Sequence, residues 1–422
     1  MKLVMYQDCI SPHQIPLARE LARNIGADEF RYVYRDKSQS GRTSIGWSMD
    51  GSEKWMVHVG SRPVEARAAI EESECLLTMF RDMALFERRA GRGLETFLQT
   101  ERWFKPKAGI LRLLSPSYRR MARRFVRLLD SGGAVYLPIG IHAAMDMARL
   151  CGLMHGDLRC LFAAPRLGFE NCPMGRVWLR QSRRAAEASS VDCRLSSVPD
   201  KHCLDKMRIW GYFVEPSKNA TRPVQEDRDA SASNLTTNDQ RLTTNTLKVL
   251  WVGRLLDLKR VDTIIKAVGY LTSQTSQTSQ TSQTFLLDIY GSGPEEARLK
   301  KLAAKYGDVI KFYPPVPIAE VRKLMRNHDL LVMSSNAYEG WGAVVSEALE
   351  EGMKVVGTYE AGASAALLPE RNLFYAGDWR ELARILRHGA ECSAIGHWTA
   401  EEAALRLVGM VKETNDVGKS VA

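Results

Sequence analysis

Two glutamates eight residues apart, Glu339 and Glu347, lie in a segment whose pattern predicts a ligand-binding edge of a parallel sheet. An apolar run, Leu330–Met333, precedes a glycine-containing loop, and a helical stretch, Ala343–Glu350, and a second apolar run, Val355–Gly357, follow it. In such a unit the loop lies at the carboxyl end of the sheet, where open α/β sheets bind ligands. Carboxylates accept hydrogen bonds from hydroxyls, and helix amino termini bind phosphate. The segment therefore suits a sugar nucleotide, although an isolated pair of this kind is more often a solvated loop acid and a helix-surface residue.

Four segments in a fixed order resemble one enzyme family. Glu339 and Glu347, within EGWGAVVSE, resemble the E-x7-E signature of the retaining glycosyltransferases of family 4. The segment LKVLWVGRLLDLKRVDTIIKA resembles the start of that family's carboxyl-terminal domain, and Leu286–Leu299 and Asn372–Leu386 follow its pattern in order and spacing. The similarity covers about residues 247–390. It implies an α/β fold of two Rossmann-like domains that face each other across a cleft, the GT-B architecture.

The resemblance also implies a donor site for a nucleotide-diphosphate sugar. By this similarity Glu347 would hold the ribose hydroxyls and Glu339 the transferred sugar, and the configuration at the anomeric carbon would be retained. The donor-binding candidates are Gly253, Arg254, Lys259, Gly291, Glu339, Gly340, Trp341, Gly342 and Glu347.

Fixed cations suit the chemistry of this donor, because a departing nucleotide diphosphate gathers negative charge as the glycosidic bond breaks. Arg254 and Lys259 match the family's diphosphate-binding residues, so no divalent metal and no other cofactor is expected. The one D-x-D, Asp227-Arg228-Asp229, lies in a polar stretch and is interpreted as a pair of solvated acids. The catalytic candidates are Glu339, Arg254, Lys259 and His142, and no residue is nominated as a covalent nucleophile.

Candidates for binding the acceptor come from the first half of the chain. His13 and Gln14 stand between a predicted strand, Leu3–Tyr6, and a predicted helix, Ile15–Ile25, a position that faces the cleft in a first βα unit. His142 precedes a helical segment, Ala143–Leu150. A structural role, as a cap for His13 or as a satisfied buried histidine for His142, is the alternative.

Three more acceptor candidates, Glu101, Arg102 and Lys105, follow the predicted strand Leu94–Leu98. Loops at the carboxyl ends of strands bind ligands in such sheets, so these side chains are expected at the acceptor or its phosphate. The alternative is that they serve only the basic surface described below.

The order of patterns predicts four parts of the chain. Residues 1–216 form the acceptor-side Rossmann-like domain, with Met207–Val214 as its last strand; residues 217–246 form a polar linker; residues 247–395 form the nucleotide-sugar domain; and residues 396–422 form a helix that returns to the first domain. Four tandem TSQ triplets, Thr272–Gln283, are expected to form a surface loop, because they have no apolar face to bury.

Positive charge is concentrated in the first half of the chain. Residues 1–216 contain 34 Lys and Arg against 24 Asp and Glu, whereas the remainder contains 25 of each. The run Arg102–Arg127 has nine basic residues, no acid, and interleaved aromatic and aliphatic residues such as Trp103 and Phe125. Such a surface is typical of contact with anionic lipid headgroups. A solvated basic helix is the alternative, and nucleic acid is not expected because no nucleic-acid-binding motif accompanies the run.

Length and composition are those of an ordinary globular protein of two or three domains: 422 residues, 45% hydrophobic and 26% charged. No apolar run reaches about 18 residues, and the start, MKLVMYQD, resembles a first strand more than a secretory signal. The eight cysteines show no metal-ligand spacing and are expected to be buried thiols. These features predict a cytoplasmic protein, peripheral on the inner face of the cell membrane, with a saccharide or lipid-linked saccharide as acceptor in bacterial polysaccharide synthesis.

Other functions remain open at this point. A dinucleotide-dependent oxidoreductase is weakly indicated by Gly291-Ser292-Gly293, which lacks the third glycine of G-x-G-x-x-G. A sugar-nucleotide epimerase or a phosphorylase would share the two-domain architecture. A non-catalytic membrane scaffold is the alternative from another class, and the intact donor motifs count against it.

Overall fold

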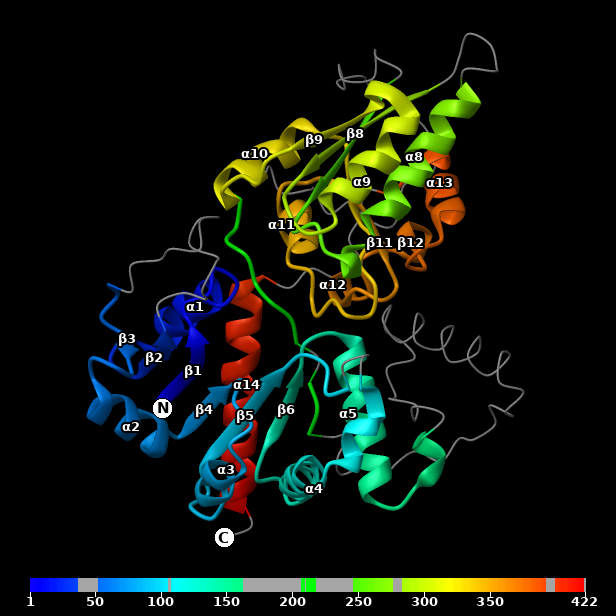
Figure 1. Cartoon of the computed structure of the whole chain (residues 1–422). Coiled ribbons are helices and arrows are strands. Elements are labelled where there is room, and N and C mark those ends of the chain that lie inside the picture. Colours follow the sequence, from blue (N-terminus) through cyan, green and yellow to red (C-terminus); the bar gives the residue numbers. More distant parts are fainter. Residues whose placement is uncertain are drawn as a thin grey trace, which may run out of the picture.

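Two six-stranded parallel sheets, one in each half of the chain, form the framework of the molecule (Figure 1). The computed structural model describes residues 1–36, 52–104, 108–161, 206–208, 210–217, 246–275, 283–391 and 399–420. The strand orders are β3-β2-β1-β4-β5-β6 and β12-β11-β10-β7-β8-β9. In both, the order reverses next to the first strand of the half, which creates the crevice where α/β sheets bind ligands.

The first sheet is covered on both faces, because its strands are apolar on both sides. Its strands are β1 (Leu3–Cys9), β2 (Phe30–Asp36), β3 (Met56–His58), β4 (Cys75–Thr78), β5 (Glu95–Thr100) and β6 (Val135–Pro138). Its α-helices are α1 (Ile15–Ile25), α2 (Pro63–Glu72), α3 (Met83–Ala90), α4 (Pro116–Asp130) and α5 (Ile141–Met154), with 3-10 turns η2 (Gly109–Leu114) and η3 (Leu158–Leu161). Buried residues of α3, α4 and α5 pack on one face, and those of α1 pack on the other.

The second sheet repeats this arrangement. Its strands are β7 (Thr246–Val252), β8 (Thr284–Tyr290), β9 (Ile310–Tyr313), β10 (Leu330–Met333), β11 (Lys354–Thr358) and β12 (Leu373–Phe374). Its α-helices are α8 (Val261–Thr275), α9 (Glu296–Ala303), α10 (Ile318–Asn327), α11 (Val344–Glu350), α12 (Gly362–Leu367) and α13 (Trp379–His388), with 3-10 turns η4 (Asp257–Lys259), η5 (Ala304–Val309) and η6 (Glu370–Asn372). The predicted strand–loop–helix–strand unit around Glu339 and Glu347 is therefore confirmed as β10–α11–β11.

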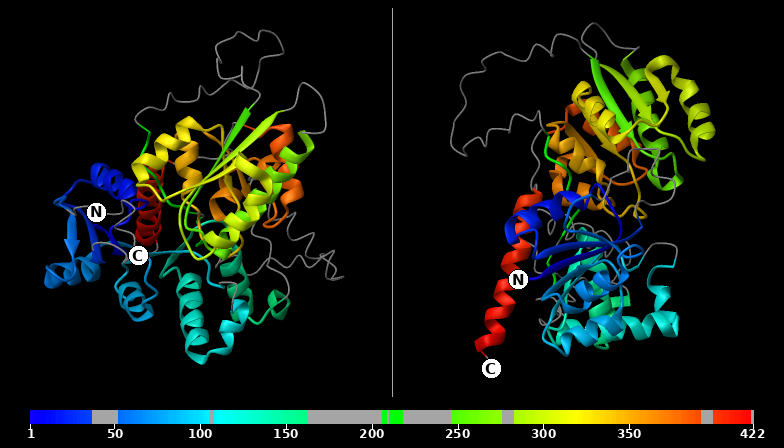
Figure 2. Two further views of the ribbon diagram at one scale, coloured as in Figure 1. Left: turned by 45° about the horizontal axis from the view of Figure 1, so that its top comes forward. Right: turned by 90° about the vertical axis from the view of Figure 1, so that its left-hand side faces the viewer.

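The last helix, α14 (Ala400–Ser420), packs on the first half of the chain, although it follows the second half in sequence. Its buried residues Ala404 and Leu407 share an apolar cluster with Leu17 and Leu21 of α1. Figures 1 and 2 show it running beside the amino-terminal sheet. At its start Thr399 and Glu402 exchange hydrogen bonds between each side chain and the other's N–H, the arrangement of a capping box. Most of the predicted linker, residues 218–245, lies outside the described residues, so the domain boundaries stay a proposal.

Two predicted elements differ in the structure. Among the described residues of Met207–Val214, which leave out residue 209, no regular strand forms. Met207 makes an isolated bridge to Tyr136 of β6, Trp210 makes one to Ile139 just after β6, and the chain then runs on without regular pairing. Gly211 follows the last bridge, and its missing side chain leaves room for the indole of Trp341 from the second half. The helix α8 also extends to Thr275, so the first TSQ triplet is helical, with the Thr272 hydroxyl donating to the Val268 carbonyl at 3.0 Å.

The cysteines are partly as expected. Cys9, Cys75 and Cys160 are free and buried, whereas Cys151 is disulfide-bonded, which the sequence did not predict. Among the helices of the described residues, none is long and apolar enough to cross a membrane.

Candidate active site

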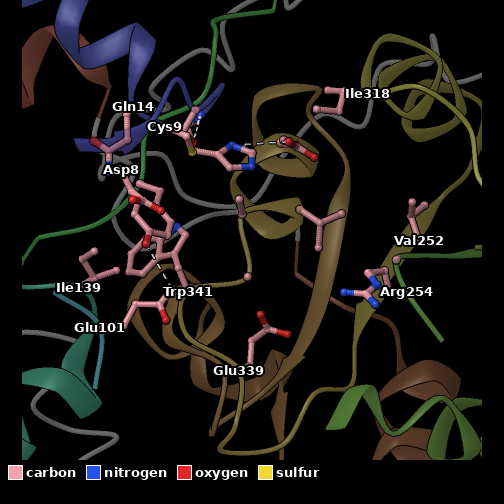
Figure 3. A pocket seen from close by; sticks show the side chains of 18 of the residues that line it. Asp8, Cys9, Gln14, Glu101, Ile139, Val252, Arg254, Ile318, Glu339 and Trp341 are labelled. Atoms are coloured by element: carbon pink, nitrogen blue, oxygen red, sulfur yellow. Dashed lines mark hydrogen bonds and ion pairs between the residues drawn. The ribbon is translucent and has the colours of Figure 1, made fainter. Parts of the chain in front are cut away.

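A cleft of about 1080 Å³ lies between the carboxyl ends of the two sheets. Figure 3 shows Asp8, Gln14 and Glu101 on its amino-terminal side and Val252 and Arg254 on the opposite side. Of the residues predicted from the sequence, those that line it are His13, Gln14, Glu101, Arg102, Gly253, Arg254, Lys259, Gly291, Glu339, Trp341, Gly342 and Glu347. Residues far apart in the chain thus face one space.

Two glycine loops present Arg254 to this cleft. A Cβ atom on Gly291, which follows β8, would lie 1.8 Å from the carbonyl oxygen of Gly253, which follows β7, so the two loops can touch only because Gly291 has no side chain. Backbone hydrogen bonds fasten the loops, with the Gly253 N–H donating to the Tyr290 carbonyl at 3.0 Å. Arg254 between them is exposed, and no ion pair in the described part of the chain involves it. Its guanidinium is therefore available to an anion.

Lys259 and Glu339 form an ion pair across the cleft wall. The Lys259 ammonium donates to Glu339 Oε2, which also accepts from the Ser335 hydroxyl at 2.9 Å. The Ser334 hydroxyl donates to the Lys259 carbonyl at 2.6 Å and holds the lysine backbone beside β10. Both predicted donor-site residues thus hold each other in place while their charges are balanced.

Glu347 is buried at the back of the cleft, which rules out the alternative of a helix-surface residue. It is 8% exposed, and its Oε1 lies 3.9 Å from Nδ1 of His13 in the other half. Burial raises the pKa of the Glu347 carboxyl to about 7, against a smaller lowering by Arg322. The predicted donor and acceptor candidates Glu347 and His13 therefore meet across the two halves.

Trp341 fills the contact between the halves. A Cβ atom on Gly211 would lie 2.7 Å from the Trp341 ring, and one on Gly140 would lie 3.5 Å from it. The indole N–H donates to the Ser346 hydroxyl at 3.3 Å. Gly340 does not line the cleft, and the carboxylate of Glu101 covers it so closely that a Cβ there would lie 2.2 Å away. The donor loop is thus seated on the amino-terminal half.

Of the remaining predicted residues, Arg102 and Glu101 line the cleft and Lys105 lies outside the described residues. Arg102 forms an ion pair with Asp146 at 3.0 Å and also donates to the Ala337 carbonyl at 3.3 Å, which ties it to the donor loop. Glu101 accepts from the Tyr212 hydroxyl at 3.2 Å.

His142 is not among the residues that line the cleft, so its catalytic role stays a prediction without support from this geometry. Its Nε2 lies 2.8 Å from the carbonyl oxygen of Tyr359 in the second half, and burial lowers its pKa. This geometry favours a structural contact between the halves, which was the alternative interpretation. His142 is the second residue of α5, and its ring contacts the second half through the Tyr359 carbonyl.

The carboxyl-terminal half matches a known family. Residues 235–392 match the family model of glycosyl transferases group 1. The chain resembles this family over that stretch. It is a glycosyltransferase that takes its sugar from a nucleotide sugar, so the predicted family and enzyme class are confirmed, and the oxidoreductase, epimerase, phosphorylase and scaffold alternatives are set aside.

Solved structures of other glycosyltransferases share the fold. HepE from Anabaena in complex with UDP and glucose has a TM-score of 0.51 and 13% identity over 100% of each chain. Its complex with UDP has a TM-score of 0.50 and 15% identity over 100% of this chain and 99% of that one. A glycosyltransferase from Rickettsia africae has a TM-score of 0.50 and 11% identity over 98% and 94%. At such low identities the structural similarity shows the fold alone, and it confirms the predicted GT-B class. No curated protein matches the sequence.

Three glutamine side chains of this glycosyltransferase line the cleft. Of these, Gln14 was predicted from the sequence, whereas Gln7 and Gln99 were not. Gln7, Gln14 and Gln99 are each 6% exposed or less, and each has one side-chain polar atom without a hydrogen-bond partner in the described structure. Gln7 and Gln99 lie near the carboxyl ends of β1 and β5, and each follows directly after a residue paired with Thr78 of β4, namely Tyr6 and Leu98. A polar residue near the end of an apolar strand was the available signal.

No group of three or more metal-ligating side chains that could hold a metal ion occurs among the residues described. Asp227 and Asp229 of the D-x-D lie outside those residues.

Proposed function

We propose that this cleft binds a nucleotide-diphosphate sugar against the carboxyl-terminal half and transfers the sugar, with retention, to a saccharide held by the amino-terminal half. The observation that supports this most is the convergence of Arg254, the Lys259–Glu339 pair and Glu347 on one cleft. Arg254, which has no ion-pair partner among the described residues, and Lys259 suit the diphosphate. Glu339 suits the sugar, and the buried Glu347 suits the ribose.

The exchange of partners at Lys259 is the central step of donor binding in this proposal. When the diphosphate arrives, Lys259 turns from Glu339 to a phosphate oxygen and joins Arg254 there. Glu339 is then free to accept a hydroxyl of the transferred sugar, while Ser335 still holds one of its oxygens. As the glycosidic bond breaks, both cations stabilise the charge that collects on the leaving group. The residues of this chain supply that stabilisation without moving a proton.

Glu347 is proposed to hold the ribose hydroxyls. Its carboxyl is buried in the second half, and one carboxyl oxygen lies toward His13 of the first half. No hydrogen-bond partner of this side chain is recorded within the described structure. HepE binds UDP and UDP-glucose, and on that likeness we propose a uridine nucleotide as the donor of this chain.

The amino-terminal wall supports a saccharide acceptor. Gln7, Gln14 and Gln99 offer polar atoms with no partner in the described part of the protein, and such atoms are costly to bury unless a ligand satisfies them. Amides both donate to and accept from hydroxyls, so they suit a neutral, hydroxyl-rich ring.

The surface of η2 and α4 is proposed to rest on an anionic membrane, but through fewer residues than the sequence indicated. Trp103, Phe104 and Phe125 belong to the core of the first half. Arg102 is paired in the cleft, and Arg124 is paired with Glu87. Membrane contact through Arg102–Arg127 stays a prediction, and it is restricted to part of this run because the apolar side of α4 packs on the sheet.

What remains is a compact face, which we call the basic face. It consists of the exposed Leu111 and Leu114 with Arg119, Arg120, Arg123 and Arg127. Leu111 is 65% exposed and Leu114 is 76% exposed, which suits shallow insertion between headgroups. Each engaged Arg contributes about 1 kcal/mol near an anionic leaflet, so the four would concentrate the enzyme there. The proposed location is the inner face of the cell membrane, with a lipid-linked saccharide of a bacterial surface polysaccharide as acceptor.

Donor turnover tests the donor proposal. We expect the wild type to hydrolyse one member of a panel of UDP-glucose, UDP-galactose, UDP-N-acetylglucosamine and GDP-mannose, and Arg254→Glu to lose at least 100-fold of that activity. Arg387→Glu, a charge reversal at an exposed arginine of α13 outside the cleft, is the matched control and is expected to keep full activity. Equal activity of Arg254→Glu and the control would contradict the donor site.

Co-sedimentation with vesicles tests the basic face separately. Wild type is expected to bind vesicles containing phosphatidylglycerol at low salt and to be released by added salt. A variant with Arg119, Arg120 and Arg123 changed to Gln is expected to lose most of this binding while keeping donor turnover. Equal binding of both proteins would remove the membrane proposal and leave the donor site untouched.

A further inference from the structure

Arg81 is a cleft-lining cation that has no acidic partner among the described residues. It lies between β4 and α3, and its guanidinium carbon stands 4.1 Å from the centre of the Trp103 ring. No ion pair recorded for the residues that the structure describes involves it. Burial lowers the pKa of Arg81, but a guanidinium stays protonated at neutral pH. This half-buried guanidinium, which offers five donors, has the Tyr118 hydroxyl as a hydrogen-bond partner and keeps donors for a further acceptor.

A second arginine stands behind it. Arg112 of η2 lies with its guanidinium carbon 4.7 Å from the centre of the Tyr118 ring, and it donates to the Trp103 carbonyl at 3.2 Å. The Tyr118 hydroxyl donates to the same carbonyl at 2.9 Å. Trp103 and Tyr118 thus separate two like charges. Asp146, an acid close enough to act on Tyr118, has its oxygens occupied by Arg102 and by the Phe104 N–H.

The position of these cations links the cleft to the basic face. Arg81 borders the cleft, whereas Arg112 belongs to the same 3-10 turn as the exposed Leu111 and Leu114. A ligand with its sugar in the cleft and its lipid chain at that turn must pass these two arginines. Guanidinium groups bind phosphate oxygens in paired hydrogen bonds, and they do so best where water is partly excluded.

We infer that Arg81, supported by Arg112, binds the phosphate that joins the acceptor saccharide to its lipid. This inference rests on the proposed function and names the chemical class of the acceptor, a phosphate-linked saccharide. The three amides and Arg81 then divide the acceptor between them: the amides bind the uncharged ring, and the arginine binds the charged linkage.

Titration calorimetry with farnesyl phosphate, farnesol and inorganic phosphate as probes tests the inference. We expect the full-length wild type to bind farnesyl phosphate at least tenfold more tightly than either of the other probes. Arg81→Gln is expected to lose about tenfold or more of the affinity for farnesyl phosphate and to leave farnesol binding unchanged. Arg81→Lys is expected to recover part of the loss, because it restores the charge without the fork geometry.

Arg120→Gln on the basic face is the matched control, with an expected change of less than twofold. A loss in the control as large as in Arg81→Gln would assign the effect to general surface charge and overturn the inference. Unchanged binding by Arg81→Gln, or binding of inorganic phosphate as tight as that of farnesyl phosphate, would overturn it too. Arg112→Gln provides a second variant should Arg81→Gln unfold, and a loss of at least threefold of the affinity for farnesyl phosphate is expected.

Donor hydrolysis by Arg81→Gln keeps the two proposals apart. It is expected to equal that of the wild type, because Arg81 lies on the wall opposite Arg254. Absence of donor hydrolysis in the wild type counts against the proposed function. Intact donor hydrolysis without discrimination between farnesyl phosphate and farnesol counts against this inference alone.

Discussion

The Glu347 carboxyl makes the stability of the protein depend on pH in a direction opposite to that of a salt-bridged acid. Its pKa is raised from 4.5 to about 7 in the folded protein, because burial disfavours the charged form. Between those two values the folded state holds more protons than the unfolded state. The free energy of unfolding therefore falls as the pH rises through this window, and it levels off above about pH 7.

The size of the effect follows from the shift. A difference of about 2.5 pKa units corresponds to about 3 kcal/mol at 1.36 kcal/mol per unit, and most of it, about 2 kcal/mol, develops between pH 5 and pH 8. Two charged or titratable neighbours bear on this carboxyl, His13 at 3.9 Å and Arg322, which lowers its pKa. Glu347→Gln keeps the shape and removes the titration.

Urea unfolding at pH 5, 6, 7 and 8 is the assay. Relative to the wild type, Glu347→Gln is expected to gain about 2 kcal/mol between the lowest and the highest pH. Glu320→Gln, at an exposed glutamate of α10, is the control and is expected to follow the wild type at every pH. The same measurement in a His13→Gln background separates the histidine's own titration. A difference between Glu347→Gln and wild type that does not change with pH would refute the reasoning, because it would show that the buried carboxyl stays ionised.

Further changes probe the contact between the halves, the acceptor wall and the TSQ tract. Gly211→Ala is expected to lower stability by about 1–3 kcal/mol in thermal unfolding, because the new Cβ would lie 2.7 Å from the Trp341 ring. Gly409→Ala in α14 is the control: its Cβ would have no heavy atom within 4 Å, so the change is expected to be neutral or stabilising. Gln99→Leu is expected to raise the KM for the acceptor. The melting temperature should stay equal or rise, because the Gln99 side-chain oxygen has no hydrogen bond in the described structure to lose. A fall in melting temperature with an unchanged KM would contradict the acceptor role. Deletion of residues 276–282 is expected to leave activity and melting temperature nearly unchanged, since loop-closure entropy varies by about 0.6 kcal/mol per doubling of length, and a collapse of stability would show that the tract packs against the domain.

The donor loop could be predicted from the sequence because its signals are local. The apolar runs of β10 and β11, the glycines between them and the spacing of Glu339 and Glu347 all lie within about 30 residues, and each is a physical constraint on one chain segment. Gly253 and Arg254 follow a strand in the same way. The loops that follow parallel strands all lie at the same edge of the sheet, so the cleft could be predicted too.

The partners of these residues could not be predicted, because contact between distant segments leaves no local pattern. Lys259 and Glu339 are 80 residues apart, and His13 meets Glu347 across the two halves. The burial of part of the basic run could not be predicted for another reason. An amphipathic basic helix that packs on a sheet and one that packs on lipid have the same periodicity, so the burial of Phe125 was not distinguishable from membrane contact by pattern alone. Arg81 escaped notice because one arginine after a strand carries no spacing signal.

A crystal structure of the protein with UDP-glucose bound is the most direct test of the donor site. It is expected to place the diphosphate within hydrogen-bond distance of Arg254 and Lys259, with the Lys259–Glu339 pair broken, Glu339 on a sugar hydroxyl and Glu347 on the ribose. A nucleotide bound elsewhere, or bound in the cleft while Lys259 stays on Glu339, would contradict this account.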